Sequence, residues 1–212
     1  MKTESLGGFD RFRVPAALLV IAIHTGPLLS LNGEANYLLT DILARIAVPF
    51  FFSVSGWFLV PRLLREGRAA LIPFVKKLLL LYGAAVLLYL PLNLYNHTLE
   101  ESGFALLRDV LFNGTFYHLW YFPALVLGAC LVYGLLRILG PRWAWLPALL
   151  LYAAGLLGDS YFGLTAALPP LRAGYEALFL LFDYTRNGLF FPPVFLLLGG
   201  WLALRPARRS AA

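Results

Sequence analysis

The sequence predicts an all-α protein, a polytopic transmembrane helix bundle of six spans with both termini in the cytoplasm. Of its 212 residues, 60% are hydrophobic and 13% are charged, whereas soluble domains carry about 25% charged residues. The basic residues cluster between long apolar runs rather than on one solvated face, which indicates membrane topology and not nucleic-acid binding. The single Cys130 lies in an apolar run, so the sequence predicts neither a disulfide framework nor a cysteine metal site.

Each predicted span is an apolar run long enough to be considered for crossing a bilayer, and the chain length fits a single membrane domain over residues 1–212. The spans cover residues 12–31, 42–60, 74–94, 119–139, 143–160 and 188–204. The fifth is short, and the third includes Lys76 and Lys77 near its start. Arg13 lies against the first apolar run and five further runs follow, so we expect a retained first helix and not a signal peptide.

The distribution of Lys and Arg predicts the orientation in the membrane. With the N-terminus inside, only four of the 17 basic residues fall on the outer side, namely Arg45, Arg108, Arg172 and Arg186. Because cytoplasmic loops carry the excess of Lys and Arg, we expect a multi-pass protein of the plasma (inner) membrane with both termini cytoplasmic and the lipid bilayer as a partner.

The first span carries Arg13 near one end and His24 eleven positions later. At about 100° and 1.5 Å per residue, His24 lies within about 20° of the face of Arg13 and about 16 Å further along, near the centre of a hydrocarbon layer about 30 Å thick. Ionisable groups at that depth usually face a bundle interior or a wet cavity. A His hydrogen-bonded to a neighbouring helix is the alternative, but an Arg on the same stripe favours a functional site.

The second span contains an outer Arg and a run of small residues. Arg45 either extends to the outer headgroups or faces the cavity that holds His24. Pro49 is expected to kink the helix. The Ser-x-Ser-Gly run at 53–56 predicts close helix packing, with hydroxyl groups that hydrogen bond across helices.

The predicted inner loop, residues 61–77, carries Arg62 and Arg65. Such residues are either an orientation signal that touches anionic lipid or a docking patch for a phosphate-rich cytosolic ligand, because guanidinium groups match phosphate oxygens.

Polar and aromatic residues also stand at the predicted outer ends of the fourth and sixth spans. Trp120 suits an interfacial aromatic belt, and His118 is either solvated or a second polar group over the cavity. Arg186 and Asn187 follow Asp183, so this stretch is either a local ion pair or a rim that binds a substrate.

The chain contains no P-loop, dinucleotide fingerprint, HExxH or GxSxG motif. Several stretches do form an ordered set: FDRFR followed by His24, RIAVPFFFSVSGWFL, the Arg62–Arg65 pair, YHLWYFPAL and TRNGLFF. Across residues 9–191 this set resembles the N-terminal part of the acyltransferase 3 family, bacterial integral-membrane O-acyltransferases related to the membrane domain of membrane-bound serine racemases. The chain is similar to the first six of about ten helices of that family.

This resemblance implies transfer of an acyl group, usually acetyl from cytosolic acetyl-CoA, to a hydroxyl of an extracytoplasmic acceptor such as a cell-envelope glycan. It also implies that His24 is essential and that Arg13 lies near the donor. In this hypothesis Arg13, Arg62 and Arg65 hold the donor phosphates, and no metal takes part. His24 acts as a base on the acceptor hydroxyl, or alternatively carries the acyl group itself.

The remaining candidates would act on the acceptor side. Arg45 would orient the acceptor or stabilise the oxyanion, and the acceptor would contact His118, Trp120, Arg186 and Asn187. Two rival interpretations stay open: a small-solute, amino-acid-like permease domain, or a non-catalytic truncated remnant. Because the family usually has more helices, further helices from another chain are a possible partner.

Overall fold

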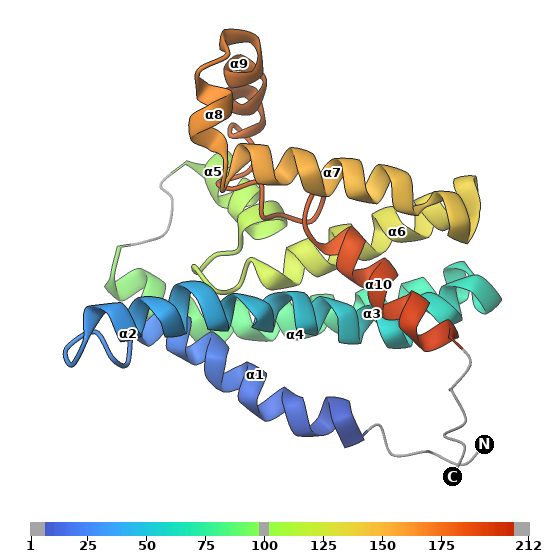
Figure 1. Cartoon of the computed structure of the whole chain (residues 1–212), viewed down its shortest axis with the longest axis horizontal. Helices are drawn as coiled ribbons and strands as arrows, with labels where there is room; N and C mark the ends of the chain where they lie inside the picture. Colours follow the sequence, from blue (N-terminus) through green and yellow to red (C-terminus); the bar gives the residue numbers. More distant parts are fainter. Residues whose placement is uncertain (1–6, 98–101, 206–212) are drawn as a thin grey trace.

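The computed structural model describes residues 7–97 and 102–205, and within these ranges every regular element is a helix (Figure 1). Among the described residues, three helices are long and apolar enough to cross a membrane, namely Gly33–Glu66, Arg68–Tyr95 and Tyr121–Trp143. The predicted all-α class is confirmed. Six spans remain a prediction, because α7 (Trp145–Gly158) and α10 (Pro192–Leu204) have 14 and 13 residues. The predicted cytoplasmic termini concern residues 1–6 and 206–212, outside the described ranges.

Helix α1 (Gly7–Thr25) ends before the predicted limit of the first span at residue 31. Gly26 adopts a φ of +55°, its N–H donates to the carbonyl of Ala22 at 3.0 Å, and Pro27 follows. A glycine in the left-handed region followed by proline is a helix stop. His24 therefore lies in the last turn of α1, and the prediction that it sits midway along the helix is wrong.

Residues Gly33–Glu66 form one helical rod whose winding changes before Pro49. The rod comprises α2 (Gly33–Tyr37), the π-helical η1 (Leu38–Leu43), the 3₁₀ turn η2 (Ala44–Ile46) and α3 (Ala47–Glu66). Proline has no N–H for the bond one turn back, so the irregular winding is the form that the predicted kink takes. The predicted loop at 32–41 is instead helical from Gly33 onward.

Helices α3 and α4 (Arg68–Tyr95) are joined by Gly67 alone, so the predicted inner loop at 61–77 is wrong. Gly67 has φ +59° and ψ −127°, a conformation that essentially only glycine adopts. The two helices turn back on each other over one residue, and α3 remains helical through Arg62 and Arg65.

We predict that Gly67→Ala destabilises the protein by about 1–3 kcal/mol, the usual cost of a residue held in a disfavoured backbone region. No atom lies within 4 Å of the added Cβ, so the loss is purely conformational. Thermal unfolding in detergent measures it. Gly83→Ala in α4 is the control, because its Cβ also meets open space and alanine favours a helix. Equal melting temperatures for the two variants would contradict the prediction.

Helix α10 packs closely along α3 because glycines line their contact. A Cβ on Gly56 would overlap the backbone of Leu196, and a Cβ on Gly199 would overlap the carbonyl oxygen of Ser53. The predicted close packing at the Ser-x-Ser-Gly run is therefore confirmed. Ser53 and Ser55 donate to carbonyls one turn back in α3, at 2.8 and 2.9 Å, and Ser55 also hydrogen bonds Tyr121 of α6.

Helix α6 (Tyr121–Trp143) completes the core between α3, α4 and α10. It changes direction at Gly140, close to the predicted end of the fourth span at 139. Its buried residues include Leu125 and Val132, which belong to one apolar cluster with Phe52 of α3 and Leu196 of α10.

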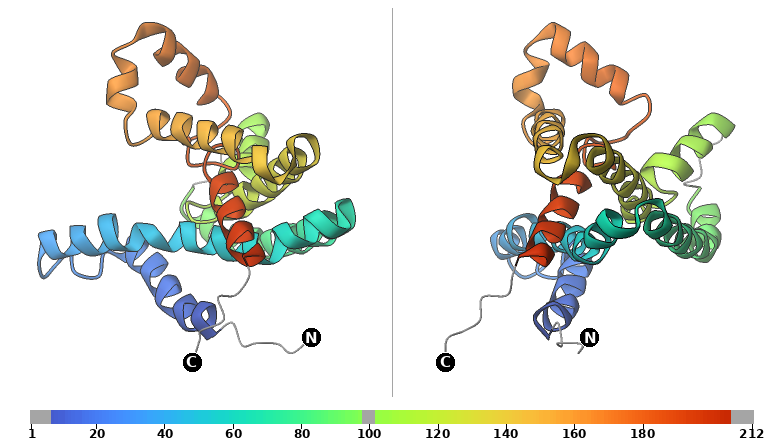
Figure 2. Two further views of the ribbon diagram at one scale, coloured as in Figure 1. Left: turned by 45° about the vertical axis from the view of Figure 1, so that its right-hand side comes forward. Right: turned by 90° about the vertical axis from the view of Figure 1, so that its right-hand side faces the viewer.

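The two longest segments between the predicted spans also contain short helices where loops were expected. The first holds α5 (Gly103–Arg108) and the π-helical η3 (Asp109–Asn113), and the second holds α8 (Phe162–Ala166) and α9 (Pro169–Leu178). Helices α8 and α9 project from the bundle next to the end of α7 in all three views (Figures 1 and 2).

Candidate functional site

A cavity of about 590 Å³ opens at the end of the bundle where α1 ends and the 33–66 rod begins. Four residues singled out in the sequence line it, namely His24, Arg45, Trp120 and Arg186. They come from α1, η2, the start of α6 and the loop before α10. Residues far apart in the sequence thus share one concave surface.

The His24 imidazole is an exposed part of this wall and touches a cluster of aromatic rings. Its ring centroid lies 4.9 Å from that of Tyr117 and 6.0 Å from that of His118. His118 itself packs between Tyr89 and Phe116, at 4.6 and 5.1 Å, and lines neither of the two cavities described here. His118 therefore packs behind His24 without facing either cavity.

Arg45 is held at the cavity by Asp41, which lies one turn earlier. Its Nη2 donates to Oδ1 of Asp41 at 2.8 Å, and the other carboxylate oxygen accepts from Thr40 at 2.9 Å. Both Asp41 and Arg45 lie in the irregular η1–η2 winding that precedes Pro49. The sequence reasoning missed Asp41, although the i, i+4 spacing of an acid and a base is a readable signal.

Arg186 pairs across the cavity wall with Asp159 at the end of α7, at 2.7 Å between Nε and Oδ2. The Nε–H makes no directed hydrogen bond, so the contact is electrostatic. The guanidinium also lies 5.7 Å from the ring centroid of Tyr184. Asp183, the neighbour expected as a local ion-pair partner, instead pairs with Arg108 at 3.3 Å.

The TRNG stretch builds the loop that presents Arg186. Thr185 donates to the carbonyl of Gly155 in α7 at 2.6 Å. The buried Asn187 side chain donates to the carbonyl of Tyr184 at 2.8 Å and accepts from the N–H of Leu189 at 3.0 Å. Both bonds stay within the loop, so Asn187 shapes the turn that was predicted to be a substrate-binding rim.

A second cavity of about 230 Å³ adjoins the first and shares His24, Trp120 and Arg186 with it. Its other lining residues are aromatic or amide side chains: Phe112, Asn113, Tyr117, Tyr184 and Asn187. The three shared side chains therefore form the boundary between a wider charged chamber and a smaller aromatic one.

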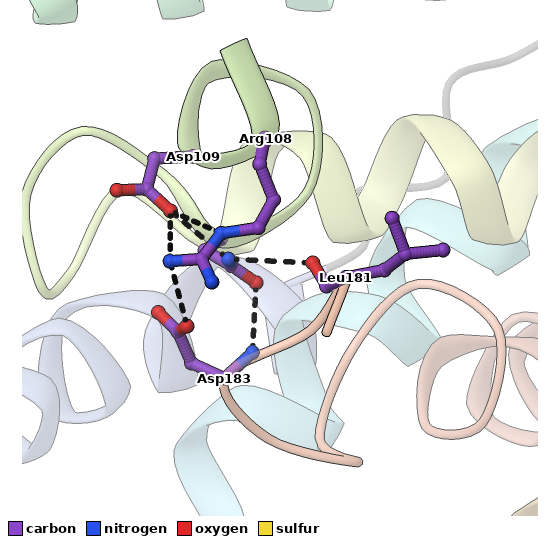
Figure 3. Close-up of polar contacts among 5 residues, drawn as sticks. Arg108, Asp109, Leu181 and Asp183 are labelled. Carbon is purple, nitrogen blue, oxygen red and sulfur yellow. Dashed lines mark hydrogen bonds and ion pairs between the residues drawn. The ribbon is translucent and has the colours of Figure 1, made fainter. Parts of the chain in front are cut away.

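A polar network fixes the loop from the side of the smaller cavity (Figure 3). Arg108 donates to Asp109 at 3.0 and 3.2 Å and also pairs with Asp183. Asn113 donates to Asp109 at 3.0 Å and accepts from the N–H of Asp183 at 3.1 Å. The two contacts with Asp183 join segments at least 70 residues apart, and no local sequence pattern indicates them.

The residues expected to bind the donor do not line either cavity. Arg13 is exposed and pairs with Asp10 at 3.1 Å, and Arg62 and Arg65 lie 3.3 and 3.9 Å from Glu66 at the other end of α3. Arg62 follows Arg45 by 17 positions along the 33–66 rod, which corresponds to about 25 Å.

Arg13 is also distant from that pair. Its neighbour Phe12 packs on Phe50 near the start of α3, with ring centroids 4.8 Å apart. Phe50 precedes Arg62 by about 18 Å of helix, so the predicted donor cluster of Arg13, Arg62 and Arg65 is not assembled in the described structure.

The wider cavity combines two Arg–Asp pairs, whose charges cancel, with one imidazole. The imidazole can accept a proton from a bound hydroxyl, and a guanidinium can stabilise an oxyanion. Within residues 7–97 and 102–205, no group of three His, Cys, Asp or Glu side chains is placed to hold a metal ion.

Comparison with known proteins places this architecture in a family. The model of the acyltransferase domain (Acyl_transf_3) matches residues 6–212. An amino-acid racemase of Enterococcus faecalis is 45% identical over 98% of this chain and 29% of its own length, and a serine/alanine racemase of Enterococcus gallinarum is 43% identical over 96% and 30%. The chain thus spans about three tenths of these relatives, and no solved structure matches it. The chain belongs to the acyltransferase 3 family.

Proposed function

We propose that the chain transfers an acyl group from acyl-CoA, with acetyl-CoA as the expected donor, to a hydroxyl of an extracytoplasmic acceptor such as a cell-envelope glycan. The observation that carries the proposal is the wider cavity, whose wall brings together the imidazole of His24 and the guanidinium groups of Arg45 and Arg186. Membership of an acyltransferase family supports acyl transfer in general.

The proposed reaction uses His24 as the base. Its imidazole takes the proton of the acceptor hydroxyl while the oxygen attacks the thioester carbonyl. Arg45 neutralises the oxyanion of the tetrahedral intermediate. The carbon–sulfur bond then breaks, and the departing thiolate receives the proton from the imidazolium. A covalent acyl-histidine, formed and then cleaved by the acceptor, is the alternative route.

The donor must reach this site from a distance. Arg62 and Arg65 stand about 25–30 Å along the 33–66 rod from Arg45, so phosphates bound there require the donor's long arm to extend along the bundle. Arg13 would then contact the arm rather than the phosphates.

Purified protein in vesicles, supplied with labelled acetyl-CoA on one side, tests the proposal through release of free CoA and label transfer. No donor hydrolysis or transfer under any acceptor condition would overturn it.

Arg45→Gln should reduce acyl transfer by about 10²-fold, because removal of one oxyanion-stabilising donor typically costs that much. Arg172→Gln is the matched control. Arg172 also pairs with an acid one turn away, Glu176 at 2.7 Å, but lines neither cavity. The measurement is the initial rate of CoA release at saturating donor. Equal losses in both variants would show that Arg45 acts only through its ion pair.

A second candidate function is binding and passage of an amino-acid-like solute. Two observations favour it: the cavity offers both guanidinium and carboxylate groups, which suit a zwitterion, and the relatives are named as racemases of amino acids. Uptake of radiolabelled serine or alanine by vesicles, without acetyl-CoA consumption, would favour this function. Acetyl-CoA consumption without uptake would favour acyl transfer.

A further inference from the structure

Helix α7 is too short to cross a bilayer by itself. Its 14 residues extend about 21 Å, against a hydrocarbon layer of about 30 Å. The residues just before its N-terminal end are typical of a membrane interface, because the guanidinium of Arg142 lies 5.7 Å from the ring centroid of the exposed Trp143. The other end, at Gly158, therefore stops about 9 Å short of the opposite surface.

The hairpin formed by α8 and α9 begins at that point. In the right-hand view of Figure 2, which looks along the longest axis of the molecule, the hairpin (orange) stands out to the side of the other helices. It extends across the long axis, that is, in the direction of the membrane plane if the bundle crosses the bilayer lengthwise.

Large apolar side chains are exposed on the hairpin as well as on α7. Leucines exposed by 40–62% follow one another along α7, at Leu146, Leu150 and Leu157. Beyond α7, Leu164 and Leu171 are 69% and 45% exposed. A large apolar side chain left in water lacks the free energy of about 1.5–3 kcal/mol that its burial would contribute. An apolar partner would therefore stabilise such a surface.

Two polar side chains of the hairpin are hydrogen bonded to backbone carbonyl groups, which suits a partly apolar environment. The hydroxyl of Thr165 donates to the carbonyl groups of Leu157 and Phe162, both at 2.9 Å. The phenol of Tyr175 donates to Ala154 of α7 at 2.6 Å, and Tyr175 also packs on Gly158. The charged pair Arg172–Glu176 lies about 100–140° around α9 from Leu171.

We propose that the α8–α9 hairpin lies in the plane of the bilayer, at the boundary between headgroups and acyl chains of the leaflet at the cavity end. Leu164 and Leu171 contact lipid chains, and Arg172 and Glu176 face the headgroups and water. An amphipathic helix in this position buries its apolar side about 5–10 Å into the boundary, which matches the distance that α7 leaves uncovered. This inference does not depend on the proposed function.

The hairpin position has a consequence for the cavity. The segment that contains the hairpin starts at Asp159 and ends at Arg186, and both residues line the wider cavity. Lipid contact along the hairpin therefore sets the depth of the cavity mouth relative to the membrane surface.

Depth-dependent fluorescence quenching tests the proposal. In a Cys130→Ser background, single cysteines replace Leu164, Leu171 or Glu176 and carry an environment-sensitive nitrobenzoxadiazole dye, with the protein reconstituted in phosphatidylcholine vesicles. We expect the labels at Leu164 and Leu171 to emit at shorter wavelength. Nitroxide on the upper acyl chain should quench them severalfold more than aqueous iodide does, and the Glu176 label should show the reverse.

Two results would overturn the proposal. Iodide quenching at Leu164 and Leu171 as strong as at Glu176 would place the hairpin in water. Protection of both labels from iodide and from lipid-borne nitroxide alike would show that protein, and not lipid, covers this surface. Correct folding of each labelled variant is checked by its thermal unfolding in detergent.

Discussion

Replacing His24 by Asn is expected to lower the rate of acyl transfer by about 10²–10⁴-fold, the usual contribution of a positioned general base. His24 is the one histidine among the residues that line either cavity, and the two carboxylates of the wider cavity are held in ion pairs with Arg45 and Arg186. Asparagine keeps a polar side chain of similar size without a group that accepts a proton near neutral pH. The measurement is acetyl transfer by purified protein in vesicles.

The matched control is His97→Asn. His97 is exposed, lies beyond the end of α4 and has a φ of 52°, which asparagine tolerates well. We expect this variant to keep full activity, and both variants to insert into the membrane in equal amounts. Retained transfer by His24→Asn would remove the catalytic role of His24, whereas an equal loss in both variants would indicate damage to the fold.

Gly199→Ala is expected to destabilise the protein by about 3 kcal/mol or more, which exceeds the loss expected for Gly67→Ala. The added Cβ would coincide with the carbonyl oxygen of Ser53, a backbone atom of α3 that can move only if the helix moves. Overpacking of a tight core usually costs 1–3 kcal/mol, and more where backbone must shift. Thermal unfolding in detergent, monitored as the fraction of protein that stays monodisperse, measures the effect.

Gly134→Ala in α6 is the matched control, because nothing lies within 4 Å of its added Cβ. Alanine is favoured over glycine within a helix by about 0.5–1 kcal/mol, so this variant should be as stable as the parent or more so. Similar melting temperatures for the two variants would show that α3 and α10 are not in the close contact described.

Much of the fold follows from the sequence because apolar length is a strong and local signal. The centres of the predicted spans fall on α1, α3, α4, α6, α7 and α10. The ends were less predictable. The predicted loop at 61–77 rested on its basic residues, but a cluster of Arg and Lys can lie on a continuing helix, and the chain reverses at Gly67 alone. The helix stop at Gly26–Pro27 can be recognised in the sequence, and it ends α1 although apolar residues follow.

Three residues of the candidate site stand out in the sequence, but their ion-pair partners do not. His24 and Arg45 stand out because charged or polar groups are rare in apolar runs, and Arg186 because it stands at the entrance to the sixth run; all three line one cavity. Their partners depend on tertiary structure. Asp159 reaches Arg186 only because Thr185 fastens its loop to α7, a contact across 30 residues. The roles assigned to Arg13, Arg62 and Arg65 stay predictions, since these side chains lie away from the cavity.

The one-residue turn at Gly67 limits how α3 and α4 can move relative to each other. Two helices joined by a single residue keep their adjoining ends together, so relative motion between them is a hinge about Gly67. The far end of α3 continues into the winding that carries Asp41 and Arg45. A change in the tilt of α3 against α4 would therefore displace one wall of the wider cavity while the turn stays in place.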